Sequence, residues 1–329
     1  EQNNLYFALY DKAVSILNIA DYDDSRKLLE GRAKEDARYV LALATETQMG
    51  MTINARNLER LLRRLDSLPL AEAAELKQQL EARARKIAPS LVRFTEAGKY
   101  EREVYSVEME SQPVRNSKSV SLVEFCENPD ERILTALLYS RSDCSYRQVR
   151  EIVANMNSSE LAEIFEQVFK NLCSYHSLPR AFEVASFTFE LSMSSSCFAQ
   201  VKRHRMASIF FGRRASEYVV PPLLLKLNMD DAISEVIRHS NLLSVALDKH
   251  LPGLGDYILT NAHRVTLLFK ANLRELYHFS RLRSDEHAQW EIRELSEQMD
   301  LLLLEKAPLA AAKLMGKHEF QREKDTFTN

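Results

Sequence analysis

The sequence repeats itself at an offset of 218 residues. Residues 38–65 align without a gap to residues 256–283, and the same offset aligns GKYE at 98–101 with GKHE at 316–319. A repeat at a constant offset predicts two related folded units in one chain. Because residue 1 matches residue 219, we expect the first unit to lack its upstream half in this chain. The identical pairs in the aligned block are Tyr39/Tyr257, Leu41/Leu259, Ala44/Ala262, Asn54/Asn272, Arg56/Arg274, Leu58/Leu276 and Arg63/Arg281.

Hydrophobic periodicity predicts a mixed chain in which helix dominates. Leucines three and four residues apart predict helices over 54–88 with a break at Pro69, and residues 5–50 read as helices with a turn at 21–24 and a helical period again over 34–47. Further helices are expected over 130–139, 146–155, 160–175, 230–250 and 272–305. Strands are expected at 120–125 and 182–193, where apolar or Phe- and Thr-rich residues gather. Strands are therefore confined mainly to the second half.

The charged, serine-containing stretch 101–118 has the composition of a linker. We therefore expect two regions: residues 1–118, the C-terminal half of a first repeat plus the linker, and residues 119–329, a second and more complete repeat. A length of 329 residues is consistent with two domains.

Composition excludes several classes of protein. A net charge of −3 lacks the basic excess of a dedicated nucleic-acid-binding protein. No apolar run approaches the roughly 18 residues of a membrane span, and the N-terminal residues lack a signal-peptide pattern. The four cysteines show no CxxC pair and no metal-like spacing, which favours reduced thiols in the cytoplasm and argues against a metal site. The glycines form no phosphate-binding loop, so any nucleotide binds without one.

The first motif that could carry chemistry is RHRMAS at residues 203–208. Arg203 and Arg205 flank His204 just after an expected strand, with Gln200 upstream and Ser208 downstream. Guanidinium groups pair well with phosphate or with an electron-rich carbonyl edge, and a cation would stabilise a reduced flavin. The alternative interpretation is a solvated basic patch, which residue type alone favours.

A second motif occurs in both copies. Asn54 and Arg56 begin one expected helix, and Asn272 and Arg274 begin its equivalent. Asparagine is a good helix cap, so ordinary capping with a surface arginine is the simpler interpretation at each position. Its recurrence in both copies favours a functional role.

A third motif is LRSDEHAQWEIREL at residues 282–295. Arg283 and His287 are four residues apart, which predicts one helical face able to bind an anion. Trp290 is expected to pack in the core. The charged neighbours Asp285, Glu286, Glu291 and Arg293 are expected to form a solvated face.

Other catalytic classes have little support. Cys173, His176 and Ser177 lie close in sequence, but no acid is placed to orient a nucleophilic triad. No HExxH motif or paired metal spacing occurs. No catalytic nucleophile and no metal are expected.

Taken together, these segments resemble the flavin-dependent thymidylate synthase family. The family signature RHRxxSxNExSxRY is matched at residues 203–205 and 208, and the FEHxxFTF segment resembles residues 182–189. The family stretch NxRxLxHFxxLRxxxxAQWEIR is closely matched over 272–293, and ARxxLP followed by NAR resembles residues 37–41 and 54–56. The resemblance covers about residues 120–329 and, as a half unit, about 5–100.

The resemblance implies an α+β fold in two tandem copies, with a small antiparallel sheet packed against long helices. It implies reductive methylation of dUMP to dTMP, in which methylenetetrahydrofolate gives the carbon and NADPH reduces FAD. It also implies a homo-oligomer, here two tandem chains resembling a tetramer. By motif position, FAD would contact Arg203, His204, Arg205, Asn272, Arg274, His287, Asn54 and Arg56, and dUMP would contact Gln200, Ser208, Arg283 and Arg38.

The sequence also departs from the family pattern. After Ser208 the family has NExSxRY, but here Phe210 and Phe211 replace polar substrate contacts. Val184 replaces the FEH histidine, and Asp256 stands where the second copy would carry the phosphate-binding arginine. In the first copy, Leu65 matches Arg283. Each copy thus keeps a different subset, which suggests a composite site joining Arg38, Asn54 and Arg56 to the missing upstream half.

Two further interpretations compete with the enzyme. The first is a catalytically degenerate structural or regulatory paralogue that binds flavin weakly or not at all, which the departures favour. The second is nucleic-acid binding through the basic residues 202–205 and 213–214, which the acidic net charge disfavours.

Overall fold

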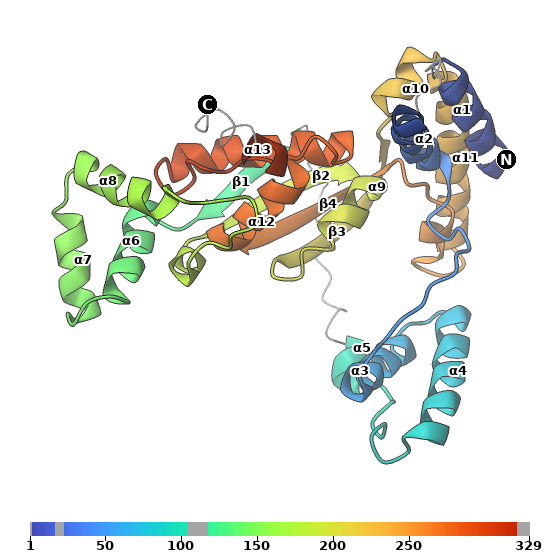
Figure 1. Cartoon of the computed structure of the whole chain (residues 1–329). Helices are drawn as coiled ribbons and strands as arrows, with labels where there is room; N and C mark the ends of the chain where they lie inside the picture. The colour runs from blue at the N-terminus through green and yellow to red at the C-terminus, as the bar shows by residue number, and fades with distance from the viewer. Residues whose placement is uncertain (1, 17–22, 104–117, 321–329) are drawn as a thin grey trace. The chain divides into compact units, whose positions relative to one another are not determined.

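The computed structural model describes residues 2–16, 23–103 and 118–320 (Figure 1). The chain forms two compact units. One contains Glu1–Thr45 together with Asn116–Asn329, and the other is Glu46–Arg115. The first 45 residues therefore fold with the second repeat. The linker expected at 101–118 falls largely outside the described residues.

A four-stranded antiparallel sheet forms the centre of the larger unit. Its strand order is β1-β2-β4-β3, so β2 and β4 are internal. The side chains of β4 alternate between buried and more exposed positions, as expected for a strand with one face on the core. The strands are β1 (Val120–Phe125), β2 (Ser186–Ser194), β3 (Ser208–Tyr218) and β4 (His263–Asn272). The strand at 120–125 was predicted correctly, the second begins later than 182, and β3 and β4 were not predicted.

Helices α12 (Leu273–Arg283) and α13 (Trp290–Lys306) run along one face of the sheet (Figure 1). Phe187, Phe189 and Phe269 from the sheet are fully buried against Phe279 and Ile292 from these helices. Burial of each such side chain contributes about 1.5–3 kcal/mol. The expected helix 272–305 is therefore two helices, because residues 284–289 leave the helical path.

A three-helix group covers one end of the sheet. Asn157 caps α8, because its Oδ1 accepts bonds from the backbone N–H groups of Ser159 and Glu160. The expected helix 160–175 ends at Phe169. The group comprises α6 (Pro129–Tyr139), α7 (Tyr146–Ala154) and α8 (Ser158–Phe169), followed by a 3₁₀ turn, η2 (Arg180–Val184).

Helices from both repeats form a second hydrophobic core. Leu9 of α1 and Leu227 after α10 are buried in it, and these residues are equivalent in the repeat register. Tyr39 and Ile237 are buried in the same core. The elements are α1 (Gln2–Ile16), α2 (Asp23–Ala37), η1 (Arg38–Val40), α10 (Pro222–Lys226), α11 (Asp230–Asp248) and η3 (Leu254–Tyr257), and α9 (Ser195–Val201) joins β2 to β3. The helical period expected over 34–47 is wrong beyond Val40, where η1 ends, because residues 41–54 form no helix.

The two repeats meet at a bridge between equivalent residues. Ala42 pairs with Thr260 in an isolated antiparallel bridge, and these positions differ by the repeat offset of 218. Two backbone bonds flank the bridge, from Leu43 N–H to Leu259 O at 2.8 Å and from Asn261 N–H to Leu41 O at 2.9 Å.

The repeat register exchanges these two bonds. Residue 43 becomes 261, and residue 259 becomes 41, so each bond maps onto the other. Such exchange is the mark of a twofold axis, here a local one that relates the two repeats. The register found in the sequence is therefore also the register of the contact between the repeats.

The smaller unit repeats the helices that follow β4. Helices α3 (Ala55–Asp66) and α4 (Ala71–Ile87) match α12 and α13 at the same offset, and a short helix, α5 (Lys99–Glu103), matches residues 317–320. Asp66 holds this unit together through Lys77 at 2.6 Å and Arg102 at 2.8 Å. The break expected at Pro69 lies between α3 and α4.

Candidate functional site

His204 lies at the centre of a buried hydrogen-bonded network in the second repeat. Its Nδ1 is 3.0 Å from Glu275 Oε1, and its Nε2 accepts a bond from Arg283 Nε at 3.1 Å. His204 lies in the turn between α9 and β3, whereas Glu275 and Arg283 lie at opposite ends of α12. The short turn after α9 therefore inserts the imidazole beside one helix.

The network fixes the protonation of His204. The Nε–H of Arg283 can only donate, so His204 Nε2 must be unprotonated and Nδ1 carries the hydrogen bonded to Glu275. Burial lowers the pKa of His204, and the hydrogen bond to Glu275 opposes this effect. The imidazole is therefore neutral at pH 7, in the Nδ1–H tautomer.

Arg283 is held in one orientation by three bonds. Besides His204, its two terminal nitrogens donate to Gln200 Oε1 at 2.9 Å and to the Gln200 carbonyl at 3.1 Å. Burial lowers the pKa of Arg283, and the nearby charge of Arg203 lowers it further. A guanidinium has five N–H donors, so two remain for a ligand. An oriented fork of this kind suits a carbonyl edge or a phosphate.

The other residues of the RHR motif surround this network at the surface. Arg203 and Arg205 are exposed, and Ser208 is the exposed first residue of β3, paired with Lys270. The motif thus divides into one buried histidine and two exposed cations. Cations of this kind are available to an anionic ligand.

Asn272 and Arg274 line a cavity of about 230 Å³ that also contacts Glu275. Asn272 Oδ1 accepts from the Glu275 backbone N–H at 2.9 Å, so it caps α12. Arg274 donates to the Leu178 carbonyl and to Glu183, each at 2.8 Å. Both side chains therefore have structural partners within this chain.

Arg38, Asn54 and Arg56 lie in two different units. Arg38 is exposed on η1 in the larger unit. Asn54 caps α3 in the smaller unit by accepting from Asn57 N–H at 2.9 Å, and Arg56 is exposed on the same helix. The Asn cap therefore recurs in both copies with the same geometry.

The prediction that Arg283 and His287 share a helical face is wrong. Helix α12 ends at Arg283, and His287 lies in the following loop with its side chain 76% exposed. The Ser284 backbone N–H still bonds to Ser280, but the chain leaves the helix after it. Spacing by four residues brings side chains together only where a helix continues.

The prediction of a solvated Glu291 is also wrong. Its carboxylate is buried, where it accepts from the Ser194 backbone N–H at 2.8 Å, the Ser194 hydroxyl and the Tyr39 hydroxyl at 2.8 Å. Gln289 Nε2 donates to the same Tyr39 oxygen at 2.8 Å. Burial raises the pKa of Glu291, and the bonds from Ser194 oppose this effect. The first repeat thus supplies one of the partners of a buried acid in the second.

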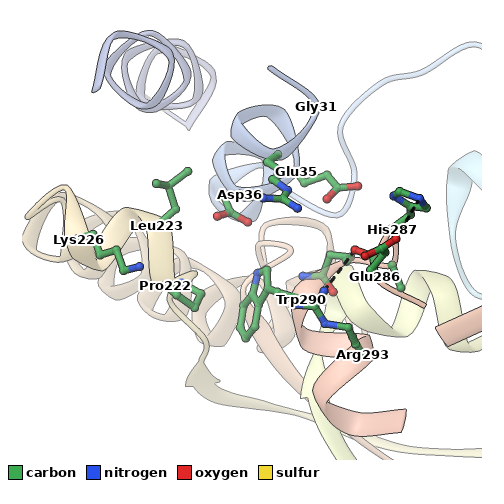
Figure 2. Close-up of a pocket in the computed structure, with 13 residues that line it drawn as sticks. Gly31, Glu35, Asp36, Pro222, Leu223, Lys226, Glu286, His287, Trp290 and Arg293 are labelled. Atoms are coloured by element: carbon green, nitrogen blue, oxygen red, sulfur yellow. Dashed lines mark hydrogen bonds and ion pairs between the residues drawn. The ribbon is translucent and has the colours of Figure 1, made fainter. Parts of the chain in front are cut away.

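A cleft of about 470 Å³ is lined by residues of α2, α10 and α13 and of the loop before α13 (Figure 2). Asp36 and Glu35 of α2 face Trp290 and Arg293 of α13, with Lys226 at one end. Its size is within the range of small-molecule sites. His287, one of the residues assigned to FAD by motif position, lines the same cleft.

Asp36 is the most perturbed acid of this cleft. Burial raises the pKa of Asp36 to about 7, and Glu35 adds to the rise, whereas the Trp290 indole and Arg32 oppose it. The Trp290 ring stacks on Tyr39 with centroids 6.4 Å apart. This cleft was not predicted from the sequence, because α2 and α13 lie more than 250 residues apart in the chain.

The departures from the expected signature change the surface of β3. Phe210 and Phe211 are 59% and 45% exposed. The Phe211 ring lies 5.5 Å from Phe198, and the Arg214 guanidinium lies 5.0 Å from the Phe211 ring centre. Asp256 pairs with Arg214 at 3.0 Å. An apolar surface therefore stands where the family signature places polar side chains.

Val184 lies in a different place from the network. It lines a cavity of about 450 Å³ between η2 and helices α6 and α7, together with Arg132 and Arg150. The position of the expected FEH histidine is thus beside charged side chains, but Val184 offers no hydrogen bond to them.

These elements define an α+β protein with a buried Gln–Arg–His–Glu network at the junction of sheet and helix. The family model of the thymidylate synthase complementing protein matches residues 4–90 and 121–309. The chain belongs to this family.

The UPF0159 relatives are longer than this chain. A UPF0159 protein of Thermoplasma acidophilum is 24% identical over 288 residues, which cover 83% of this chain and 57% of that protein. A UPF0159 protein of Chlamydia muridarum is 22% identical over 289 residues, covering 82% and 55%. The chain therefore spans about half the length of these curated relatives.

A flavin-dependent thymidylate synthase of Pyrococcus furiosus is 32% identical over 164 residues, which cover 42% of this chain and 65% of that enzyme. Among solved structures, a UMP/dUMP methylase from Streptomyces cacaoi bound with 5-Br dUMP aligns with a TM-score of 0.46 and 18% identity, over 59% of this chain and 92% of that one. In the part of the chain that the structure describes, no helix is long and apolar enough to cross a membrane.

Proposed function

We propose that this chain forms part of a flavin-dependent thymidylate synthase that converts dUMP to dTMP with methylenetetrahydrofolate and NADPH. The observation that carries the proposal is the network in which Gln200 and His204 hold Arg283. All three were assigned to substrate or cofactor by motif position, and they come from two segments about 80 residues apart. Family membership and the synthase relative support the same reaction class.

The residues around the network fit an anionic cofactor. Arg203 and Arg205 are exposed cations beside the buried His204, a donor set that suits a pyrophosphate or the negative charge of a reduced flavin. The adjoining cavity of about 230 Å³ is smaller than a usual cofactor site, so it can hold only part of FAD. When bound, FAD supplies the hydride for the reduction.

The contribution of this chain is binding, orientation and charge placement. Arg283 directs its two remaining donors at a dUMP carbonyl or phosphate, and Gln200 with His204 keeps the guanidinium from turning away. Ser208 adds a hydroxyl at the start of β3, and Arg38 supplies a further cation from η1. No nucleophile of the enzyme is required.

The twofold contact between the repeats supports the proposed assembly. If a repeat pair within one chain imitates a dimer, two chains would place four synthase-like folds together. NADPH and the folate are proposed as soluble substrates, and no nucleic acid is involved.

A structural or regulatory paralogue is the second candidate. It is favoured by Arg274, whose guanidinium is bound to Glu183 and Leu178, and by the apolar Phe210 and Phe211 on β3. A protein of this kind would keep the fold and the oligomer but bind flavin weakly or not at all.

The visible spectrum of the purified chain, with an FAD titration, separates the two candidates. Bound flavin that bleaches with NADPH and recolours in air is expected for the synthase, and the ratio of flavin to chain counts the competent repeats. Arg283→Lys should weaken dUMP binding by about tenfold or more, because lysine lacks the planar fork. Arg147→Lys, at an exposed position on α7, is the matched control. A chain that takes up no FAD would leave the paralogue as the better account.

A further inference from the structure

Residues 46–53 precede α3 and form neither a helix nor a strand. Within the residues that the structure describes, their backbone forms no hydrogen bond, and Met49 and Met51 are 82% and 51% exposed. An extended segment with bare backbone groups and exposed large side chains is a template for pairing with another strand.

The repeat register assigns this segment to a strand. Adding 218 to residues 46–53 gives 264–271, which lie within β4. Each segment ends at an asparagine that caps the following helix: Asn54 has φ −78° and ψ 159°, and Asn272 has φ −81° and ψ 163°. The backbone therefore enters α3 and α12 in the same conformation.

The side-chain pattern agrees with this assignment. In β4 the buried positions include Val265, Leu267, Phe269 and Ala271. Their equivalents in the first repeat are Thr47 and the apolar Met49, Met51 and Ile53, and the residues that alternate with them are Glu46, Gln48, Gly50 and Thr52. An alternation of period two with the apolar set on the same face is the pattern of a half-buried strand.

The position in the sheet determines which partner the segment needs. Strand β4 is internal, paired with β2 on one side and with β3 on the other. The strands β1, β2 and β3 all lie within residues 119–218. We propose that residues 46–53 form the central strand of a second sheet, completed by a polypeptide segment built like residues 119–218 of this chain.

Two facts favour this occupant over a second copy of the present chain. In another copy, β2 has neighbours on both sides, and β3 has only one edge left, so that copy cannot surround an inserted strand. The two UPF0159 relatives are also nearly twice as long as the part of them that this chain matches. The proposal does not depend on flavin or dUMP binding.

The repeat register supplies a direct test. Because residue 1 follows residue 218 in register, a second copy of residues 119–218 can be joined to Glu1 without a linker. Hydrogen exchange over residues 47–53 is then compared between the chain and this fusion. We expect fast exchange in the chain and exchange at least about tenfold slower in the fusion, because ladder hydrogen bonds protect amides.

Methionine oxidation gives an independent measurement. In the chain, Met49 and Met51 should oxidise readily and the buried Met299 slowly, whereas in the fusion all three should oxidise slowly. The fusion carrying Met51→Pro is the control, because proline removes a donor and is excluded from a central strand. Restored exposure of Met49 in this variant supports strand pairing.

Other outcomes would overturn the proposal. If β4 is protected in the fusion but residues 47–53 still exchange fast, the added segment does not pair with residues 47–53. If the amides of residues 47–53 are protected from exchange in the chain without the fusion, and this protection rises with protein concentration, the segment pairs with a second copy of the chain instead. If the fusion is insoluble, residues 119–218 are co-expressed with the chain as a separate tagged polypeptide. The proposal is supported if the chain co-purifies with this polypeptide and the Met51→Pro variant of the chain does not. It is contradicted if the chain does not co-purify.

Discussion

The hydroxyl of Tyr39 donates a hydrogen bond of 2.8 Å to the buried carboxylate of Glu291, joining residues 252 positions apart. Tyr39 belongs to the first repeat, and Glu291 belongs to the second. The tyrosine ring also stacks on Trp290, which lines the 470 Å³ cleft. Trp290 therefore belongs both to the contact between the repeats and to the wall of the cleft.

Removing the Tyr39 hydroxyl should destabilise the larger unit. Tyr39→Phe leaves the buried Glu291 carboxylate with one donor fewer and deprives Gln289 of its acceptor. We expect the free energy of unfolding to fall by about 1–3 kcal/mol, measured by urea denaturation. Tyr175→Phe, at an exposed tyrosine, is the control. Equal effects of the two variants would mean that the buried bonds add no net stability.

Glu275 should act as a positioning residue for His204. Glu275→Gln keeps an acceptor for the Nδ1–H, whereas Glu275→Ala removes it. In the alanine variant, ¹⁵N NMR of the imidazole should show loss of the pure Nδ1–H tautomer, and dUMP affinity should fall by about tenfold as Arg283 loses its orientation. The glutamine variant should retain both properties. An unchanged tautomer in the alanine variant would show that Arg283 alone fixes the ring.

Asp36 should make stability fall between about pH 4 and pH 7. Its pKa is about 7 in the folded chain against an ordinary value of 3.8, so the folded state binds the proton more tightly over this range. Unfolding therefore releases a proton, and the free energy of unfolding decreases as pH rises until Asp36 is ionised in both states. At about 1.4 kcal/mol per pKa unit, the loss has a ceiling of about 4 kcal/mol.

The Asp36→Asn variant tests this dependence. It should flatten the pH profile of unfolding between pH 4 and 7 and should be more stable than the parent at pH 8, where the parent buries a charge. Asp143→Asn, at an exposed position, should leave the profile unchanged. A profile with the same slope in both variants would assign the pH dependence to other groups.

Asn272 can be tested for capping and cofactor binding separately. Asn272→Ala should cost about 1 kcal/mol of stability, because the Glu275 N–H loses its cap. Asn272→Ser preserves a capping oxygen, so stability should change little. If the side-chain amide also binds flavin, the serine variant should still lose FAD affinity. Asn54→Ser, the equivalent change in α3, provides the comparison between repeats.

Local signals in the sequence anticipated much of the fold and part of the site. The offset of 218 was visible in Tyr39 and Tyr257, and the helix starts were visible in Asn54 and Asn272, because caps and periodicity act over a few residues. Gln200, His204 and Arg283 were selected by motif, and they lie together. Strand β4 was missed because the stretch 263–272 is flanked by helical patterns and its neighbours come from distant segments.

The sequence by itself determined the repeat register, the α+β class, the family resemblance and the residue types available for anion binding. Only the tertiary structure decided that Glu275 completes the network, that Glu291 is buried, that His287 leaves the face of Arg283 and that Asp36 faces Trp290. The physical reason is that burial and hydrogen bonding between distant segments depend on packing, which residue spacing along one chain does not specify. Residues 46–53 combine both kinds of information. The alternation of their side chains is visible in the sequence, whereas the strands that we propose as their partners come from a distant segment.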